Sequence, residues 1–360
     1  MSRIGIITIP RADNYGSVLQ AYAVQQFISQ IDPDNEVIDY VSPFLIGRYN
    51  IWQFKTDTPK VMLKSLARNI LTYRSKKKKK KKYEEFRRLI KFSKKTVYSV
   101  EQIDKYEKYV TGSDQIWNTR ITQADKAFFL NFVSNNNYKI AFSVSMGYTD
   151  RNNMEIEFYR EMISTFKWIG VREKNDVEFL RQLTSNDAFV DYIIDPTLLI
   201  SEDKWKILLN DQIIKKEYIL VYAFGNNPIV VEQAKRLSKE SNLPVYIIAD
   251  EWRKKDTNGF FNLPGIGPID FINLIANAKH IVTNSFHGAV FSIIFKKQFT
   301  VIPYEGTENR IYALLKLLNL EEAIYDNDID CRVDFSKIEK ILQYERDKAK
   351  KFLQKAIGDV

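Results

Sequence analysis

Short apolar runs of the strand type alternate with helix-type segments along almost the whole chain. In the first half, strands are predicted at residues 3–9, 36–41, 108–113, 139–146 and 167–173, with a helical pattern at 17–28. In the second half, strands are predicted at 217–225, 244–250, 280–285 and 299–304, with helical patterns at 228–241 and 270–279. Such alternation is typical of α/β proteins with mainly parallel sheets.

The alternation is interrupted once, near residues 192–205. Pro196 stops regular structure there, and Ser201 with Asp203 has the composition of a helix cap. A chain of 360 residues also exceeds the size of one ordinary core. We therefore predict two α/β domains, each with a mainly parallel sheet. The domains span residues 1–197 and 198–334, and residues 335–360 form a C-terminal helix that can pack back on the first domain.

The chain carries a formal net charge of +9, and part of this charge lies in a predicted helical insertion at residues 60–95. Seven consecutive lysines, Lys76–Lys82, occur there. They have two interpretations: a solvated helix face or crossover, or a contact with anionic lipid head groups at a membrane surface. Nucleic acid is not expected as a partner, because the run lacks the interleaved aromatic side chains on which bases stack.

The composition narrows the class of protein. Hydrophobic residues make up 45% of the chain and charged residues 28%, as in a globular protein. The single cysteine, Cys331, excludes an internal disulfide framework, and the only two histidines, His280 and His287, provide no metal-ligand set. No run has the length of a membrane span or the features of a signal peptide. We therefore expect a cytoplasmic protein, at most peripheral to the membrane, with no metal or cofactor.

Candidate binding residues follow the predicted strands, at the carboxyl ends where open α/β sheets bind ligands. After the first strand, Asn14, Tyr15, Gly16 and Ser17 begin a helix. Their backbone N–H groups suit an anion or a sugar hydroxyl. A capped turn without a ligand is the alternative.

A second group follows the strand predicted at 108–113 and comprises Ser113, Asp114, Gln115, Trp117 and Asn118. An indole beside fixed polar groups is a common arrangement in carbohydrate sites, where it forms an apolar platform. The alternative is a buried Trp117 and a loop held by its own side-chain hydrogen bonds.

Arg172 lies at the end of another predicted strand, directly before a helix. A guanidinium there can bind a carboxylate or a phosphate through two parallel hydrogen bonds. A surface salt bridge from Arg172 to Glu173 or Glu178 is the alternative.

His287 and Gly288 begin a helix after the strand predicted at 280–285. The backbone N–H groups and the positive end of the helix dipole favour a phosphate there. His287 can donate or accept a proton at neutral pH. His280, at the opposite end of the same strand, is interpreted as structural.

Together these stretches resemble the polysaccharide pyruvyl transferase family over roughly residues 4–320. The resemblance is carried, in order, by DNYGSVLQAYAVQ at 13–25, TGSDQIWN at 111–118, SVSMG at 143–147, GVREKND at 170–176, DPTLL at 195–199, SFHG at 285–288 and NRIYALLKLLNL at 309–320.

The resemblance implies a GT-B-like fold, in which two Rossmann-like domains face each other across a cleft. It also implies transfer of the enolpyruvyl group of phosphoenolpyruvate onto two hydroxyls of a sugar, which yields a pyruvate ketal and phosphate. The acceptor would belong to a bacterial capsule, exopolysaccharide or other surface glycan, or to its lipid-linked precursor. For this chain the resemblance implies that His287 is the catalytic acid and that Arg172 binds phosphoenolpyruvate. The first domain would then lie on the acceptor side and the second on the donor side.

One position departs from the family pattern. Many members carry a basic residue two positions before the histidine, where this chain has Ser285. Donor binding then falls to Arg172, to Arg310 or to the helix N-terminus at Gly288. Two other functions stay open: a GT-B glycosyltransferase that uses a nucleotide sugar, and a non-catalytic relative that binds glycans.

Overall fold

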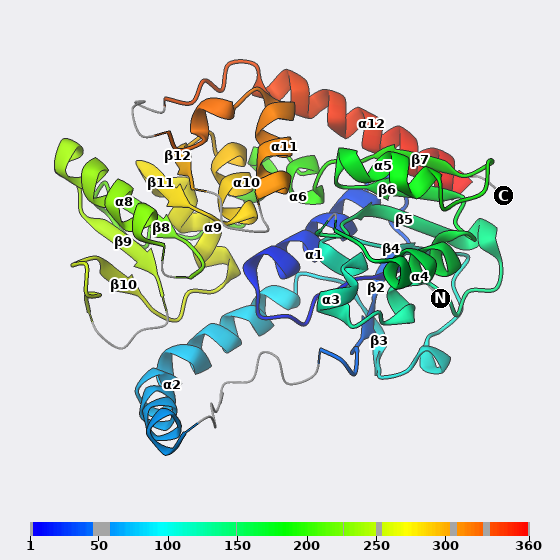
Figure 1. Cartoon of the computed structure of the whole chain (residues 1–360), viewed down its shortest axis with the longest axis horizontal. Helices are drawn as coiled ribbons and strands as arrows, with labels where there is room; N and C mark the ends of the chain where they lie inside the picture. The colour runs from blue at the N-terminus through cyan, green and yellow to red at the C-terminus, as the bar shows by residue number, and fades with distance from the viewer. Residues whose placement is uncertain are drawn as a thin grey trace. The chain divides into compact units, whose positions relative to one another are not determined.

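The computed structural model describes residues 3–45, 58–148, 150–225, 227–249, 254–302, 308–326 and 332–358. By their contacts the residues group into two compact units. The first unit combines Met1–Ile46, Arg87–Ser201 and Ser336–Val360, and the second combines Gly47–Phe86 with Glu202–Phe335. Each unit is built on one parallel sheet with helices packed around it (Figure 1). The predicted α/β class with two sheets is confirmed.

The first unit contains a seven-stranded sheet in the order β3-β2-β1-β4-β5-β6-β7. Its strands are β1 (Ile4–Ile7), β2 (Asn35–Tyr40), β3 (Phe92–Val97), β4 (Lys108–Thr111), β5 (Lys139–Val144), β6 (Trp168–Val171) and β7 (Phe189–Tyr192). The strand order reverses between β1 and β4, because the chain builds outward from β1 to β3 and then returns to the other side of β1. Ligands of open sheets bind at the carboxyl edge beside such a reversal.

Helices of the first unit are α1 (Tyr15–Ile28), α3 (Thr119–Thr122), α4 (Asn153–Ile163), α5 (Lys174–Arg181), α6 (Pro196–Leu199) and α12 (Ile338–Gly358). Short 3₁₀ turns lie at Val100–Gln102, Gln115–Trp117, Lys126–Phe129 and Asn136–Tyr138. The C-terminal helix α12 packs on this unit, as predicted. The ring centre of its Phe352 lies 5.7 Å from that of Trp168 and 6.2 Å from that of Phe142.

The second unit contains a five-stranded parallel sheet in the order β10-β9-β8-β11-β12. Its strands are β8 (Ile219–Tyr222), β9 (Val245–Ile248), β10 (Phe261–Leu263), β11 (His280–Thr283) and β12 (Gln298–Val301). Its helices are α2 (Pro59–Arg87, the last residue of which belongs to the first unit), α7 (Glu202–Lys206), α8 (Pro228–Ser241), α9 (Pro268–Asn277), α10 (Phe286–Ile294) and α11 (Glu308–Leu318), with a 3₁₀ turn at Glu321–Ala323. Here the strand order reverses between β8 and β11.

The lysine run lies in the long helix α2, as the helical pattern predicted. By its contacts, helix α2 up to Phe86 groups with the second unit. From the sequence, we instead expected this insertion to belong to the first domain, residues 1–197. Lys82 Nζ lies 2.5 Å from Asp270 Oδ2, and a Cβ added at Gly267 would lie 2.4 Å from the Lys82 Cβ. No helix in the described part of the chain is long and apolar enough to cross a membrane.

Candidate functional site

In the first unit, the residues after β1 and β4 meet at the strand-order reversal. Asn14 caps α1, since its side chain accepts a hydrogen bond from the Ser17 backbone N–H, and Tyr15 and Gly16 are buried in the first turn. The Ser17 hydroxyl donates to Asp114 Oδ2 at 2.9 Å. Ser113 is anchored below this contact, where its backbone N–H donates to Gln20 Oε1 at 3.1 Å. Ser17 of the first predicted group and Asp114 of the second are therefore in contact at the carboxyl edge.

Asp114 has an unusual backbone conformation, with φ 62° and ψ −167°. This region is almost restricted to glycine, and a side chain there costs on the order of 1–3 kcal/mol. Two hydrogen bonds hold the residue in place: its carbonyl accepts from the N–H groups of Ile116 at 2.7 Å and Ser145 at 2.9 Å. Such strain is typical of residues whose side chain must be aimed at a ligand.

Arg172 is buried among three carboxylates. Its guanidinium contacts Asp195 at 2.6 Å, Asp114 at 3.5 Å and Glu173 at 3.6 Å. Burial alone lowers the pKa of Arg172, but the charges of Asp195, Glu173 and Asp114 raise it above the ordinary value. The alternative of a surface salt bridge is wrong, because the Arg172 side chain is only 3% exposed. Among the described residues, the Arg172 guanidinium is thus in contact with three carboxylates.

Two of the carboxylates around Arg172 accept further hydrogen bonds from residues that follow neighbouring strands. Asp195 follows β7 and accepts from the Thr197 backbone N–H at 3.0 Å and hydroxyl at 2.5 Å, so it also caps α6. Glu173 accepts from the Ser145 hydroxyl at 2.6 Å. Asp195 and Ser145 were not among the predicted site residues. The signal that could have found Asp195 is its position before Pro196, which is typical of a helix cap.

Trp117 is not a sugar platform. Its side chain is fully buried, its Nε1 donates to the Phe128 carbonyl at 3.0 Å, and its ring stacks on Phe129 at 5.3 Å. Asn118 donates to Gln115 Oε1 at 2.7 Å, and both side chains pack against Gly147. The alternative of a buried indole and a self-bonded loop is therefore the one that the contacts support.

The second unit places His287 at the start of α10, directly after β11. Ser285 caps this helix, since its hydroxyl accepts from the Gly288 N–H at 3.4 Å. Gly288 is required by close packing, because an added Cβ would lie 2.3 Å from Thr283 Oγ1. The Thr283 hydroxyl in turn donates to the Tyr222 carbonyl at 2.6 Å, which ties the junction to β8 across the strand-order reversal.

The Phe286 ring contacts both His287 and Arg310 in this unit. The His287 ring centre lies 5.3 Å from that of Phe286, and the Arg310 guanidinium carbon lies 5.8 Å from the same ring. His287 is 9% exposed. Ser285, His287 and Gly288 thus lie at the N-terminus of α10, and Arg310 contacts the neighbouring Phe286 ring.

Comparison with known proteins assigns the chain to a family. A family model described as polysaccharide pyruvyl transferase matches residues 14–306. The chain belongs to this family. The match includes Arg172 and His287 and ends before Arg310. A comparison with curated protein sequences gives no match.

Solved structures similar to this polysaccharide pyruvyl transferase family member have low sequence identity. A UDP-GlcNAc 2-epimerase from Neisseria meningitidis bound to UDP-GlcNAc has a TM-score of 0.49 and 11% identity, covering 99% of this chain and 97% of its own. The Arabidopsis thaliana protein UGT89C1, complexed with quercetin, has a TM-score of 0.43 and 10% identity, covering 99% and 93%. The ADP-heptose heptosyltransferase II of E. coli has a TM-score of 0.35 and 10% identity, covering 99% and 98%. Similarity at this level carries no inference about activity.

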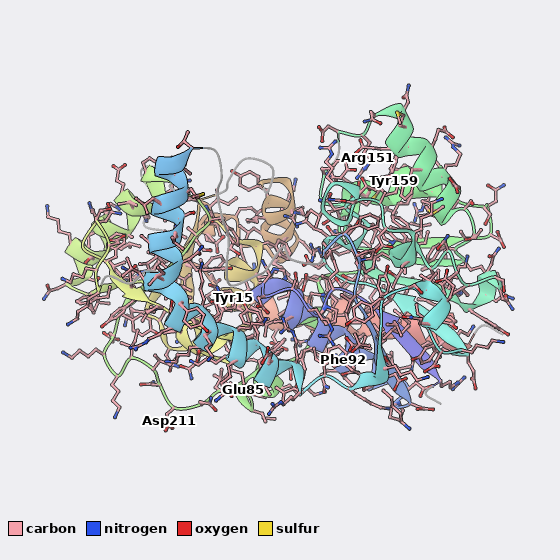
Figure 2. The ribbon with its side chains drawn as sticks, turned by 90° about the horizontal axis from the view of Figure 1, so that it is seen from below. Tyr15, Glu85, Phe92, Arg151, Tyr159 and Asp211 are labelled. Carbon is pink, nitrogen blue, oxygen red and sulfur yellow. The ribbon has the colours of Figure 1, made fainter. Side chains whose placement is uncertain are left out.

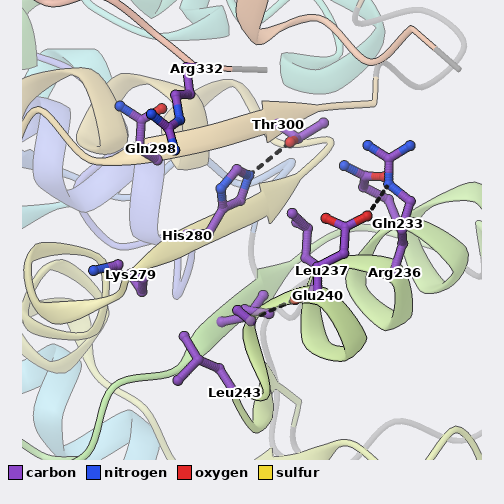
Figure 3. Close-up of a pocket in the computed structure, with 12 residues that line it drawn as sticks. Gln233, Arg236, Leu237, Glu240, Leu243, Lys279, His280, Gln298, Thr300 and Arg332 are labelled. Atoms are coloured by element: carbon purple, nitrogen blue, oxygen red, sulfur yellow. Dashed lines mark hydrogen bonds and ion pairs between the residues drawn. The ribbon is translucent and has the colours of Figure 1, made fainter. Parts of the chain in front are cut away.

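The second histidine of this pyruvyl transferase family member lies at the opposite end of β11 from His287. His280 Nε2 is hydrogen-bonded to Thr300 Oγ1 at 2.8 Å, which agrees with its structural interpretation. It lines a cavity of about 250 Å³ together with residues of α8 and with Arg332 (Figure 3). Among the described residues, no three His, Cys, Asp or Glu side chains are placed to hold a metal ion.

Proposed function

We propose that this protein transfers the enolpyruvyl group of phosphoenolpyruvate to two hydroxyls of a sugar in a bacterial surface glycan or its lipid-linked precursor. The support for this reaction is membership of the polysaccharide pyruvyl transferase family, together with the position of His287 at the N-terminus of α10. No metal or cofactor takes part in the proposal.

The reaction needs one proton donor and two hydroxyl nucleophiles. His287 donates a proton to C3 of the enol phosphate, which becomes a methyl group, and C2 becomes electrophilic. The first hydroxyl attacks C2 and loses its proton. The second hydroxyl then attacks the same carbon as the C2–O bond to phosphate breaks, and the ketal and free phosphate leave. One hydroxyl proton restores His287 and the other leaves with phosphate.

The donor is assigned to the second unit on electrostatic grounds. Phosphoenolpyruvate carries a phosphate and a carboxylate, which the N–H groups of α10 and the Arg310 guanidinium can stabilise. In the first unit, the Arg172 guanidinium is 3% exposed and already pairs with Asp195, Asp114 and Glu173, so we do not assign the donor to it. Ser285, in place of the family's basic residue, already caps α10.

The acceptor hydroxyl is assigned to the first unit. Asp114 is 15% exposed in its side chain, lies at the carboxyl edge and accepts from Ser17. A carboxylate in this position can orient a sugar hydroxyl and accept its proton. Arg172 then acts as a positioning residue that holds Asp114 and Asp195, rather than as the group that binds phosphoenolpyruvate. An electrostatic contact of Lys76–Lys82 with an anionic membrane would bring the protein to a lipid-linked acceptor.

The test is phosphate release from phosphoenolpyruvate with a panel of hexose and N-acetylhexosamine glycosides as acceptors. We expect release only when an acceptor is present. His287→Ala should lower turnover by about 10²–10⁴-fold, the usual contribution of a general acid. His280→Ala is the matched control and should retain activity.

Near-normal turnover of His287→Ala would contradict the role of this residue. Absence of phosphate release with every acceptor, combined with protection against heat by UDP or GDP but not by phosphoenolpyruvate, would instead support a glycosyltransferase. Tight glycan binding without any turnover would support the non-catalytic relative.

A further inference from the structure

Helix α2 exposes an apolar surface that the lysine run alone does not explain. Six large apolar side chains within twelve residues of this helix are at least 36% exposed: Met62, Leu63, Leu66, Ile70, Leu71 and Tyr73. Figure 2 shows α2 with its side chains, with Glu85 labelled near its C-terminal end. Exposed apolar side chains are ordinary when they are scattered, but a contiguous group marks an interaction surface.

Four of the six apolar side chains share one side of the helix with two lysines, and Leu63 lies at the margin of this side. At about 100° per residue, Met62, Leu66, Ile70 and Tyr73 lie within one quadrant, and the exposed Lys77 and Lys80 continue the same side toward the C-terminus. On other sides of the helix, Thr72, Tyr83 and Phe86 are at most 1% exposed. Lys78 and Lys82 pack against Gly265 and Gly267. We call residues 62–81 on the exposed side the α2 face.

The charge of the α2 face defines the chemistry of its partner. Helix α2 contains only two acidic residues, Glu84 and Glu85, against the seven lysines of the run. An apolar side followed by a dense cationic segment is typical of helices that lie in the plane of an anionic membrane. The apolar side chains enter the boundary between head groups and acyl chains, and the lysines contact lipid phosphates. A protein partner would need one surface with an apolar part for the apolar side chains and an acidic part for the lysines.

We propose that the α2 face docks on an anionic phospholipid membrane, with its apolar half inserted among the head groups. This inference adds an insertion surface to the electrostatic contact of the lysine run. It does not depend on the transfer reaction, because docking is measured without phosphoenolpyruvate or acceptor.

The experiment measures co-sedimentation of the full chain with vesicles. The vesicles contain phosphatidylcholine alone or phosphatidylcholine mixed with phosphatidylglycerol. We expect binding only to the anionic vesicles. Leu63→Ser with Ile70→Ser should weaken this binding at least tenfold at low and at high salt, because the apolar contribution is not screened. Lys77→Glu with Lys80→Glu should weaken it at least tenfold at low salt, and by less at high salt, where screening already reduces the ionic contribution.

Matched controls lie outside the α2 face. Ile207→Ser changes an 81% exposed apolar side chain of α7's C-terminal flank, and Lys350→Glu with Lys351→Glu changes two exposed lysines of α12. Both should bind like the unchanged protein. Circular dichroism verifies that each variant is folded.

Three results would overturn the proposal. These are unchanged vesicle binding in Leu63→Ser with Ile70→Ser, equal loss in the control variants, and equal binding to vesicles of phosphatidylcholine alone. Light scattering distinguishes a second copy of the chain as the partner. If the unchanged protein is a dimer, the serine variant a monomer and vesicle binding unaltered, the α2 face is a dimer interface instead.

Discussion

The two units carry their candidate residues at equivalent places but in opposite electrostatic settings. Both sites lie at the carboxyl edge of a parallel sheet, beside the reversal of strand order. In the first unit, Arg172 is enclosed by three carboxylates that are each fixed by further hydrogen bonds or ion pairs. In the second, His287 stands at a helix N-terminus with Arg310 nearby. The difference gives the two units separate tests, because we assign the donor to His287 in the second unit and a positioning role to Arg172 in the first.

The first test of this difference is Asp195→Ala. Among the residues of the first site, we expect removal of the Asp195 carboxylate to lower the free energy of unfolding most. Asp195→Ala leaves the buried Arg172 guanidinium without its closest carboxylate and α6 without its cap. Removing one partner of a buried ion pair costs about 3–5 kcal/mol, and we expect a loss of this size in the free energy of unfolding. Urea denaturation of the variant measures it.

The control for that experiment is Asp150→Ala, since Asp150 pairs with Arg120 at 3.3 Å while its side chain is 82% exposed. An exposed pair contributes about 0–1 kcal/mol. A similar loss in both variants would mean that the Arg172 cluster is not the buried network described above.

Gly288 provides the corresponding test in the second unit. Gly288→Ala places a Cβ 2.3 Å from Thr283 Oγ1, so the start of α10 must shift. Overpacking of this kind costs about 1–3 kcal/mol of unfolding free energy. We also expect weaker phosphoenolpyruvate binding, because His287 and the helix N–H groups move with the helix. Calorimetric titration with phosphoenolpyruvate measures the second effect.

Gly358→Ala is the matched control, because no atom lies within 4 Å of the position of its added Cβ. It should leave both quantities unchanged. Normal phosphoenolpyruvate affinity in Gly288→Ala would argue against the donor site at α10.

The last expected effect concerns pH and lies in the first unit. Burial raises the pKa of Asp176 to about 6, while Arg151 opposes this shift and Glu173 adds to it. Because this pKa lies above the unfolded value of about 3.9, the folded chain holds the proton more tightly than the unfolded chain. The contribution of Asp176 to the free energy of unfolding is therefore fully present below about pH 4, and it is lost as the pH rises through 6.

Asp176→Asn should remove this pH dependence. We expect the stability of the unchanged protein relative to the variant to fall by up to about 3 kcal/mol between pH 4 and pH 7. Urea denaturation at several pH values measures the change, and Glu178→Gln, whose side chain is 71% exposed, is the control. A relative stability that rises with pH would show that the ion pair with Arg151 dominates over burial.

The sequence predicts the interior of each sheet better than its margins. Strands such as β1, β4 and β5 are buried throughout and appear as short, mainly apolar runs, although β4 and β5 each begin with a buried lysine. The strands without a prediction are β3, β7 and β10, and all three lie at sheet edges. Edge strands are half covered, so residues such as Ser93, Lys94 and Lys95 interrupt the apolar pattern.

Because strand β7 was not predicted from the sequence, Asp195 was not predicted as a site residue either. Asp195 follows β7, and its contact with Arg172 depends on β6 and β7 being neighbours. Without that strand, the sequence offered Glu173 and Glu178 as partners, and of these Glu173 contacts Arg172, at 3.6 Å. The junction at His287 was predictable because β11 is an apolar interior strand and Ser285 and Gly288 mark the start of the helix.

The central claim, that the donor binds in the second unit, can be tested through the imidazoles. The chain contains only two histidines, so their NMR signals can be assigned with His287→Ala and His280→Ala. Titration with phosphoenolpyruvate should shift the His287 signals and leave those of His280 in place, and Arg310→Ala should weaken the response. If phosphoenolpyruvate binds without moving the His287 signals, and binding is lost in Arg172→Lys but kept in Arg310→Ala, the donor site lies at Arg172 and the claim is wrong.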